Sequence, residues 1–216
     1  MITPEQLIHV FDLFGTAVFA VTGALCGVHH KLDLLGVIVF GCTVGVGGGI
    51  LRDMIIGDVP VAALRDKSYL LICIASALTV FFIARYLSNL QKLIAVFDAV
   101  GLGVFTFIGA AKGATFDLNI IGIILCGVLT AVGGGILRDV MSKSIPVVLT
   151  SDFYATASLL GGGVFYALKR FAAWSDYSIF CAVFIFVTGI RLLAMYYKLH
   201  LPVAQSGDKA IADKEL

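Results

Sequence analysis

An all-α membrane protein is predicted by three features of this sequence: its low charge, its long apolar segments and an internal duplication. The chain has 216 residues, of which 60% are hydrophobic and only 13% are charged, and its mean hydropathy is +1.03. Soluble domains contain about 25% charged residues. A chain with so few charges cannot cover a surface that faces water, so we expect lipid to surround much of it.

The apolar segments predict seven transmembrane helices, because a helix needs about 20 apolar residues to cross the hydrocarbon core of a bilayer. The predicted spans are residues 6–28, 34–57, 68–86, 92–112, 118–142, 153–169 and 177–198. Short polar segments separate them, and Trp174 and Tyr177 suit a membrane interface. Residues 201–216 are polar and are predicted to form a disordered tail.

The chain contains two copies of one segment. Residues 7–66 align with residues 93–152 without a gap, at a constant offset of 86, and about 26 of the 60 paired positions are identical. The longest shared stretch pairs Gly-Gly-Gly-Ile-Leu-Arg-Asp at 47–53 with the same seven residues at 133–139. Identity over so many positions indicates duplication.

The duplication predicts the domain organisation. One repeat length contains three crossings, an odd number, so the second copy has to enter the bilayer upside down, as in many transporters and channels. We therefore expect a 3+3+1 arrangement: a first three-helix repeat (1–90), a second, inverted repeat (91–172) and a seventh helix (173–200). Loop charges are nearly balanced, and the tail lysines favour an outer N terminus and a cytoplasmic C terminus.

Triple glycines lie deep in the second and fifth predicted helices. They are Gly47, Gly48 and Gly49 in the first copy and Gly133, Gly134 and Gly135 in the second. Each glycine costs a helix about 1 kcal/mol relative to alanine, so three in a row predict a broken helix. Backbone carbonyls freed at that depth are tolerated only where they are buried in protein or line water, which makes these segments candidates for lining a pore.

Charged residues follow the glycines and also occupy the first helix of each copy. Arg52 and Asp53 correspond to Arg138 and Asp139, and Asp12 corresponds to Asp98. A charge at the centre of a membrane helix costs at least about 2.5–3.5 kcal/mol, so we expect these side chains to face the interior and to pair with one another. Two roles remain open: a structural ion-pair network, or acidic groups that attract cations beside arginines that shape the constriction.

Other classes of function find no support in the sequence. A net charge of +1 argues against nucleic-acid binding, and no nucleotide-binding or hydrolase motif is present, so we expect no enzyme activity. The five cysteines and four histidines lack metal-ligand spacing. No metal site and no cofactor are expected.

The duplicated Gly-Gly-Gly-x-Leu-Arg-Asp segments, with a proline a few residues later, resemble the prokaryotic branch of the trimeric intracellular cation (TRIC) channel family. The resemblance covers about residues 5–200. It implies a homotrimer in the inner (cell) membrane with one pore per protomer, permeable to monovalent cations and chiefly to potassium. It also implies that the broken second and fifth helices, with their glycines and Arg-Asp pairs, line that pore. Membrane lipids and further copies of the chain are the implied partners, and no other protein partner is indicated.

Two alternatives remain open. A secondary transporter for a small solute such as glycine needs the same inverted repeat and midplane site, and some members of the resembled family carry the name glycine transporter. A membrane scaffold that moves nothing would need the charges only for structure.

Overall fold

The computed structural model of this protein describes residues 4–150, 153–172 and 174–199, and all regular secondary structure in these residues is helical. The helices are α1 (Pro4–His29), α2 (Leu34–Ile56), α3 (Ala62–Arg65), α4 (Lys67–Ile83) with the 3₁₀ turn η1 (Ala84–Tyr86), α5 (Leu90–Thr115), α6 (Ile120–Met141), α7 (Val147–Thr150), α8 (Ala155–Phe171) and α9 (Asp176–Tyr197). The predicted tail, 201–216, lies outside the described residues.

Within the part of the chain that the structure describes, six helices are long and apolar enough to cross a membrane, and each coincides with a predicted span. They are Gln6–His29, Leu34–Ile56, Lys67–Tyr86, Leu90–Thr115, Ile120–Met141 and Asp176–Tyr197. The predicted span at 153–169 corresponds to α8, which has 17 residues and is therefore shorter than the roughly 20 that a perpendicular crossing needs. The protein is an all-helical membrane protein.

Equivalent side chains begin the second helix of each copy. Asp33 accepts a hydrogen bond from the backbone N–H of Gly36, and Asn119 accepts one from that of Gly122. Such caps satisfy N–H groups that have no partner inside the helix. Both caps occur at the same position of the repeat, so the duplicated sequence starts its second helix in the same way twice.

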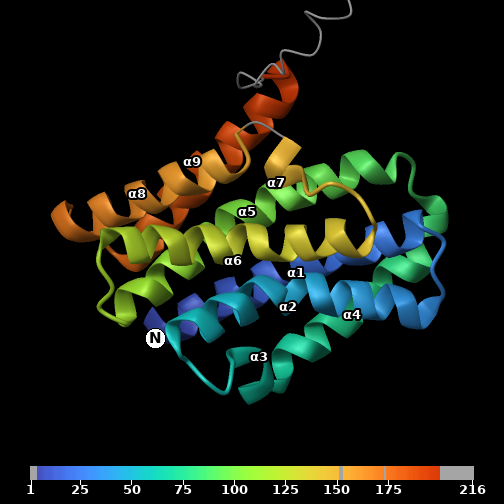
Figure 1. Cartoon of the computed structure of the whole chain (residues 1–216), viewed down its shortest axis with the longest axis horizontal. Helices are drawn as coiled ribbons and strands as arrows, with labels where there is room; N and C mark the ends of the chain where they lie inside the picture. Colours follow the sequence, from blue (N-terminus) through green and yellow to red (C-terminus); the bar gives the residue numbers. More distant parts are fainter. Residues whose placement is uncertain (1–3, 151–152, 173, 200–216) are drawn as a thin grey trace, which may run out of the picture.

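The four helices at the centre form two antiparallel pairs (Figure 1). α2 and α6 pack side by side, α1 and α5 pack together behind them, α4 contacts the first half, and α8 and α9 contact the second. At the middle, the Phe19 and Phe105 rings, which are repeat equivalents, stack with centroids 5.2 Å apart. A Cβ at Gly15 would lie 2.6 Å from Phe105, and one at Gly101 would lie 2.7 Å from Phe19. The contacts of one copy are therefore repeated by the other with the partners exchanged.

The helical assignment of α2 and α6 continues through both triple glycines, so the predicted break at these positions is not observed. The glycines serve close approach instead. A Cβ at Gly48 would collide with the carbonyl oxygen of Thr130, and a Cβ at Gly134 would collide with the equivalent oxygen of Val44. Small residues at such crossings let two backbones touch within a membrane, and this contact compensates for the poor helix propensity of glycine.

Candidate functional site

The end of α2 holds a buried ion pair. Arg52 donates from Nε and Nη2 to Oδ1 of Asp53, over 2.9 and 2.8 Å, and the side chains are only 3% and 1% exposed. After α2 the chain turns back at Gly57, which has a φ of 76°. The turn brings the backbone N–H of Ala62, at the start of α3, to 2.9 Å from Oδ2 of Asp53. The Asp53 carboxylate of this ion pair therefore holds the start of α3 against the end of α2.

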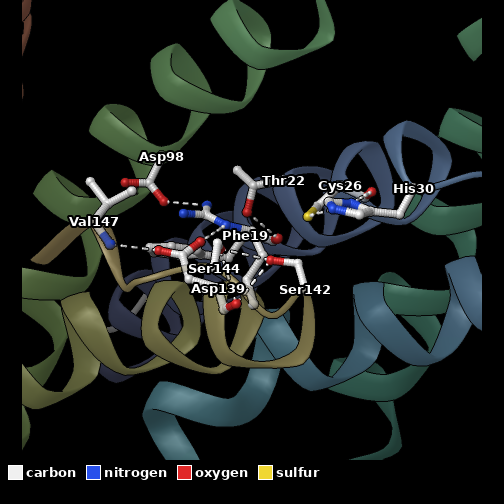
Figure 2. A network of polar contacts seen from close by, with 10 residues as sticks. Phe19, Thr22, Cys26, His30, Asp98, Asp139, Ser142, Ser144 and Val147 are labelled. Carbon is white, nitrogen blue, oxygen red and sulfur yellow. Dashed lines mark hydrogen bonds and ion pairs between the residues drawn. The ribbon is translucent and has the colours of Figure 1, made fainter. Parts of the chain in front are cut away.

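The end of α6 repeats this arrangement and extends it (Figure 2). Arg138 donates from Nε to Oδ1 of Asp139 over 2.9 Å, and Oδ2 of Asp139 accepts from the backbone N–H of Val147 over 2.8 Å. Arg138 also donates from Nη1 to Oδ1 of Asp98 on α5, over 2.6 Å. Two carboxylates therefore share one guanidinium, as charges buried at this depth require.

The equivalent aspartate of the first half is bonded differently. Asp12 on α1 accepts a hydrogen bond from the hydroxyl of Tyr69 on α4 over 2.7 Å. No ion pair of Asp12 occurs among residues 4–150, 153–172 and 174–199. The structure thus joins Asp98 to Arg138 directly, and it leaves Asp12 and Arg52 without a direct bond.

Two cavities of similar size open at opposite ends of α1 and α5. The first has a volume of about 300 Å³ and is lined by the beginning of α1, the end of α2 and the end of α5, including Asp12, Arg52 and Lys112. The second has a volume of about 340 Å³ and is lined by the end of α1, the beginning of α5 and the end of α6. Its lining includes Asp98 and Arg138. Each copy therefore contributes its ion pair to a cavity at one end of the helix bundle.

A smaller cavity extends the first one toward the centre. Its volume is about 20 Å³, and its lining includes Asp12, Thr16, Gly49, Arg52 and Phe105. The stacked rings of Phe19 and Phe105, 0% and 3% exposed, lie at the middle between the two large cavities. The two large cavities share no lining residue.

The predicted site residues thus divide into two groups. The charged residues Asp12, Arg52, Asp98, Arg138 and Asp139 line the large cavities, while Asp53 and Gly49 line the small one. The remaining glycines, Gly47, Gly48, Gly133, Gly134 and Gly135, are not among the lining residues of these three cavities and pack between helices or beside the ion pairs.

Sequence reasoning missed several residues of the site. Tyr69 and Tyr154, which lie beside the two intramembrane aspartates, fall outside the aligned repeat segments. Arg191 of α9 is 6% exposed, and its guanidinium lies 5.0 Å from the ring centre of Tyr154. The central pair was detectable, because Phe19 and Phe105 are identical positions of the repeat.

An ion-pair bridge includes Lys112, which lines the first cavity. Asp58, in the turn after α2, lies 2.5 Å from Arg65 and 2.5 Å from Lys112 of α5. Hydrogen bonds from Lys112 and then from Arg65 lower the pKa of Asp58 below its usual value. A lowered pKa means that the ionised carboxylate stabilises the folded state at neutral pH, and that this stabilisation is lost as the pH falls through the folded-state pKa.

We expect Asp58→Asn to lower the thermal midpoint Tm in detergent near neutral pH, with a loss of about 1 kcal/mol or less for such a partly solvated bridge. The Tm difference from the unsubstituted protein should persist down to about pH 5, above the unfolded pKa of about 3.9, and shrink at more acidic pH. Unfolding scans of both proteins at several pH values test this. A difference that stays constant down to the most acidic pH would contradict the assigned role.

The fold and the site define a class: a membrane protein built from paired helical repeats with charged cavities at both ends. A family model described as "Glycine transporter" matches the chain twice, over residues 9–85 and 95–170. The "UPF0126 membrane protein" of Vibrio cholerae serotype O1 is 39% identical over 198 residues, which cover 91% of this chain and 82% of that relative.

Solved structures agree with these matches. The TRIC trimeric intracellular cation channel orthologue from Rhodobacter sphaeroides is 34% identical, with a TM-score of 0.86, and the match covers 90% of this chain and all of that one. A prokaryotic TRIC channel crystallised in 0.5 M KCl is 31% identical, with a TM-score of 0.84, over 91% of this chain and all of that one. The chain belongs to this family, the prokaryotic TRIC channels.

Proposed function

We propose that each chain forms one path for monovalent cations, chiefly potassium, through the inner membrane of a prokaryote. The observation that carries the proposal is the pair of charged cavities at opposite ends of α1 and α5. The small cavity beside the first of them is lined by Phe105, whose ring stacks on Phe19. A path of this kind spans the bundle of one chain, so no second chain is needed to complete it.

Both signs of charge line the two cavities. Each half contains one arginine and two aspartates at matched positions, and Lys112 and Arg191 add a positive charge to the first and the second cavity. Arg52 is bonded to Asp53, Arg138 to Asp98 and Asp139, and Lys112 to Asp58. Because carboxylates neutralise these basic groups, the basic groups do not exclude a cation from the proposed path.

Conduction requires the centre to open. In the described conformation the aromatic stack and the α2–α6 contact close the middle, so we assign this conformation to the closed channel. Displacement of Phe19 and Phe105 would join the cavities beside Arg52 and Arg138. We further propose that α8 completes seven membrane helices, that the N terminus lies outside, and that three chains assemble as in the TRIC orthologue of Rhodobacter sphaeroides.

A carrier for glycine is the second candidate, and the description of the matching family favours it. A closed centre between two cavities also fits alternating access. The two candidates differ in rate and in solute: a channel passes potassium down its gradient without saturating at low concentration, whereas a carrier saturates and needs its own substrate.

Purified protein in liposomes separates these candidates. We expect potassium to leave loaded vesicles through the protein, while N-methylglucamine, a larger cation, does not. Radiolabelled glycine uptake, measured on the same vesicles, should equal that of protein-free vesicles. Saturable glycine uptake without potassium efflux would favour the carrier, and an absence of both fluxes would support a structural role.

A further inference from the structure

The two halves of the molecule carry the same ionisable residues but bond them differently. In the second half, Asp98 and Arg138 are 5% and 4% exposed and share a direct ion pair. In the first half, Arg52 donates from Nε and Nη2 to Asp53, and among the described residues Asp12 accepts one side-chain hydrogen bond, from Tyr69. The excess negative charge of the first half therefore rests on one partly buried carboxylate that faces a cavity.

One buried hydrogen-bond donor of Arg52, Nη1, has no partner among the described residues. Arg52 and Asp12 both line the small cavity of about 20 Å³ and the large one of about 300 Å³. A cavity needs a volume of roughly 10–15 Å³ to hold one water molecule. A buried donor without a hydrogen-bond partner costs about 1–3 kcal/mol of stability, which a water molecule would recover. The small cavity therefore has the size and the polarity to hold water between Asp12 and Arg52.

Two substitutions between the copies distinguish the surroundings of Asp12 from those of Asp98. Thr16 lines the small cavity, whereas its repeat equivalent is Leu102, which is fully buried. His9 lines the large cavity, and its equivalent is Ala95. At these two positions the first half has a hydroxyl and an imidazole group, where the second half has apolar side chains.

From this asymmetry we infer that Asp12 forms a binding site for one partly hydrated monovalent cation, and that Asp98 does not. The inference rests on the proposed function and names where along the path an ion is held. Oxygen atoms of Asp12, Tyr69 and Thr16, together with cavity water, supply ligands of the kind that potassium prefers. Arg52 and Lys112, the two basic side chains of the large cavity, do not repel the ion strongly, because Asp53 and Asp58 neutralise them. At Asp98 the guanidinium of Arg138 already occupies the position that a cation would take.

Thermal unfolding in detergent tests the site without requiring conduction. We compare potassium chloride with choline chloride at the same ionic strength, so that only specific binding differs. A ligand that binds the native state raises its stability, and we expect the Tm to rise by about 2–4 °C at several times the dissociation constant. Asp12→Asn should abolish the rise, and Asp98→Asn, the matched control, should retain it even if its starting Tm is lower.

A second variant keeps the test decisive if Asp12→Asn does not fold. Thr16→Leu installs the residue of the second half, fills the small cavity and retains Asp12, and it should also abolish the potassium-dependent rise. Crystals soaked in thallium, a potassium mimic with strong anomalous scattering, should show one peak per chain beside Asp12 and none beside Asp98. Equal peaks at both aspartates, or a potassium-dependent rise that survives Asp12→Asn and Thr16→Leu, would overturn the inference.

The cation channel and the cation site at Asp12 can be refuted independently. Potassium currents without a site that depends on Asp12 would overturn this inference and leave the channel intact. A potassium-dependent rise in Tm that Asp12→Asn abolishes, in a protein that passes no potassium, would support the site and refute conduction.

Discussion

Gly134→Ala is expected to destabilise the folded protein by about 1–3 kcal/mol or more, the usual range for an extra methyl group forced into a packed core. The added Cβ would press against the carbonyl oxygen of Val44 on α2. Backbone atoms cannot rotate away as a flexible side chain can, so α2 and α6 would have to separate. A lower Tm in detergent and a smaller yield of folded protein would measure the effect.

Two other glycines provide matched controls. A Cβ at Gly163 of α8, or at Gly189 of α9, would meet nothing within 4 Å. Alanine there improves helix propensity by about 1 kcal/mol and adds no collision within the chain, so these variants should keep or raise the Tm. If Gly134→Ala were as stable as Gly189→Ala, close packing would not explain the triple glycines.

Arg138→Met is expected to cost about 3–5 kcal/mol, the range observed when one partner of a buried ion pair is removed. Asp98 and Asp139 would both lose their counter-charge, and both are almost fully buried. Methionine preserves much of the side-chain volume, so the loss would report charge and not an empty space. Thermal unfolding in detergent measures this cost directly.

The first half provides the comparison. Arg52→Met leaves one carboxylate, Asp53, without its ion-pair partner, whereas Arg138→Met leaves two, Asp98 and Asp139. The Arg52 variant should therefore lose less stability. Adding Asp98→Asn to Arg138→Met should recover part of the loss, since one uncompensated charge is removed. Equal losses for the two arginines, with no recovery in the double variant, would contradict the network described for the second half.

The outline of the fold could be predicted because membrane insertion leaves a strong signal in the sequence. The second helix was expected at 34–57 and is found at Leu34–Ile56, since apolar length alone sets a span. The duplication also specified which contacts repeat. The matched collisions at Gly48 and Gly134 follow from one packing arrangement used twice.

The role of the glycines could not be predicted in the same way. Propensity predicted a break, because each glycine weakens an isolated helix. In the folded chain, the facing helix supplies the compensating contact, and no local pattern identifies that partner. Propensity is a weak guide wherever tertiary packing decides.

The difference between Asp12 and Asp98 was also hidden. Both occupy identical positions of the repeat, and a sequence comparison treats them alike. Their surroundings differ at other positions: Thr16 lines the small cavity with Asp12, Leu102 stands at the equivalent position of the other half, and the spacing of Tyr69 and Tyr154 differs by one residue from the repeat offset. The direct ion pair of Asp98 with Arg138 could not be predicted from the shared motif, because that motif is the same in both copies.

We propose that a single chain contains a complete cation path between its two cavities. Unitary currents, recorded from purified protein in planar bilayers with symmetric potassium chloride, test this proposal. We expect potassium currents that open in equal, independent steps, up to three for one trimer. A single indivisible conductance would place the path between chains, and the absence of any potassium current would refute the path itself.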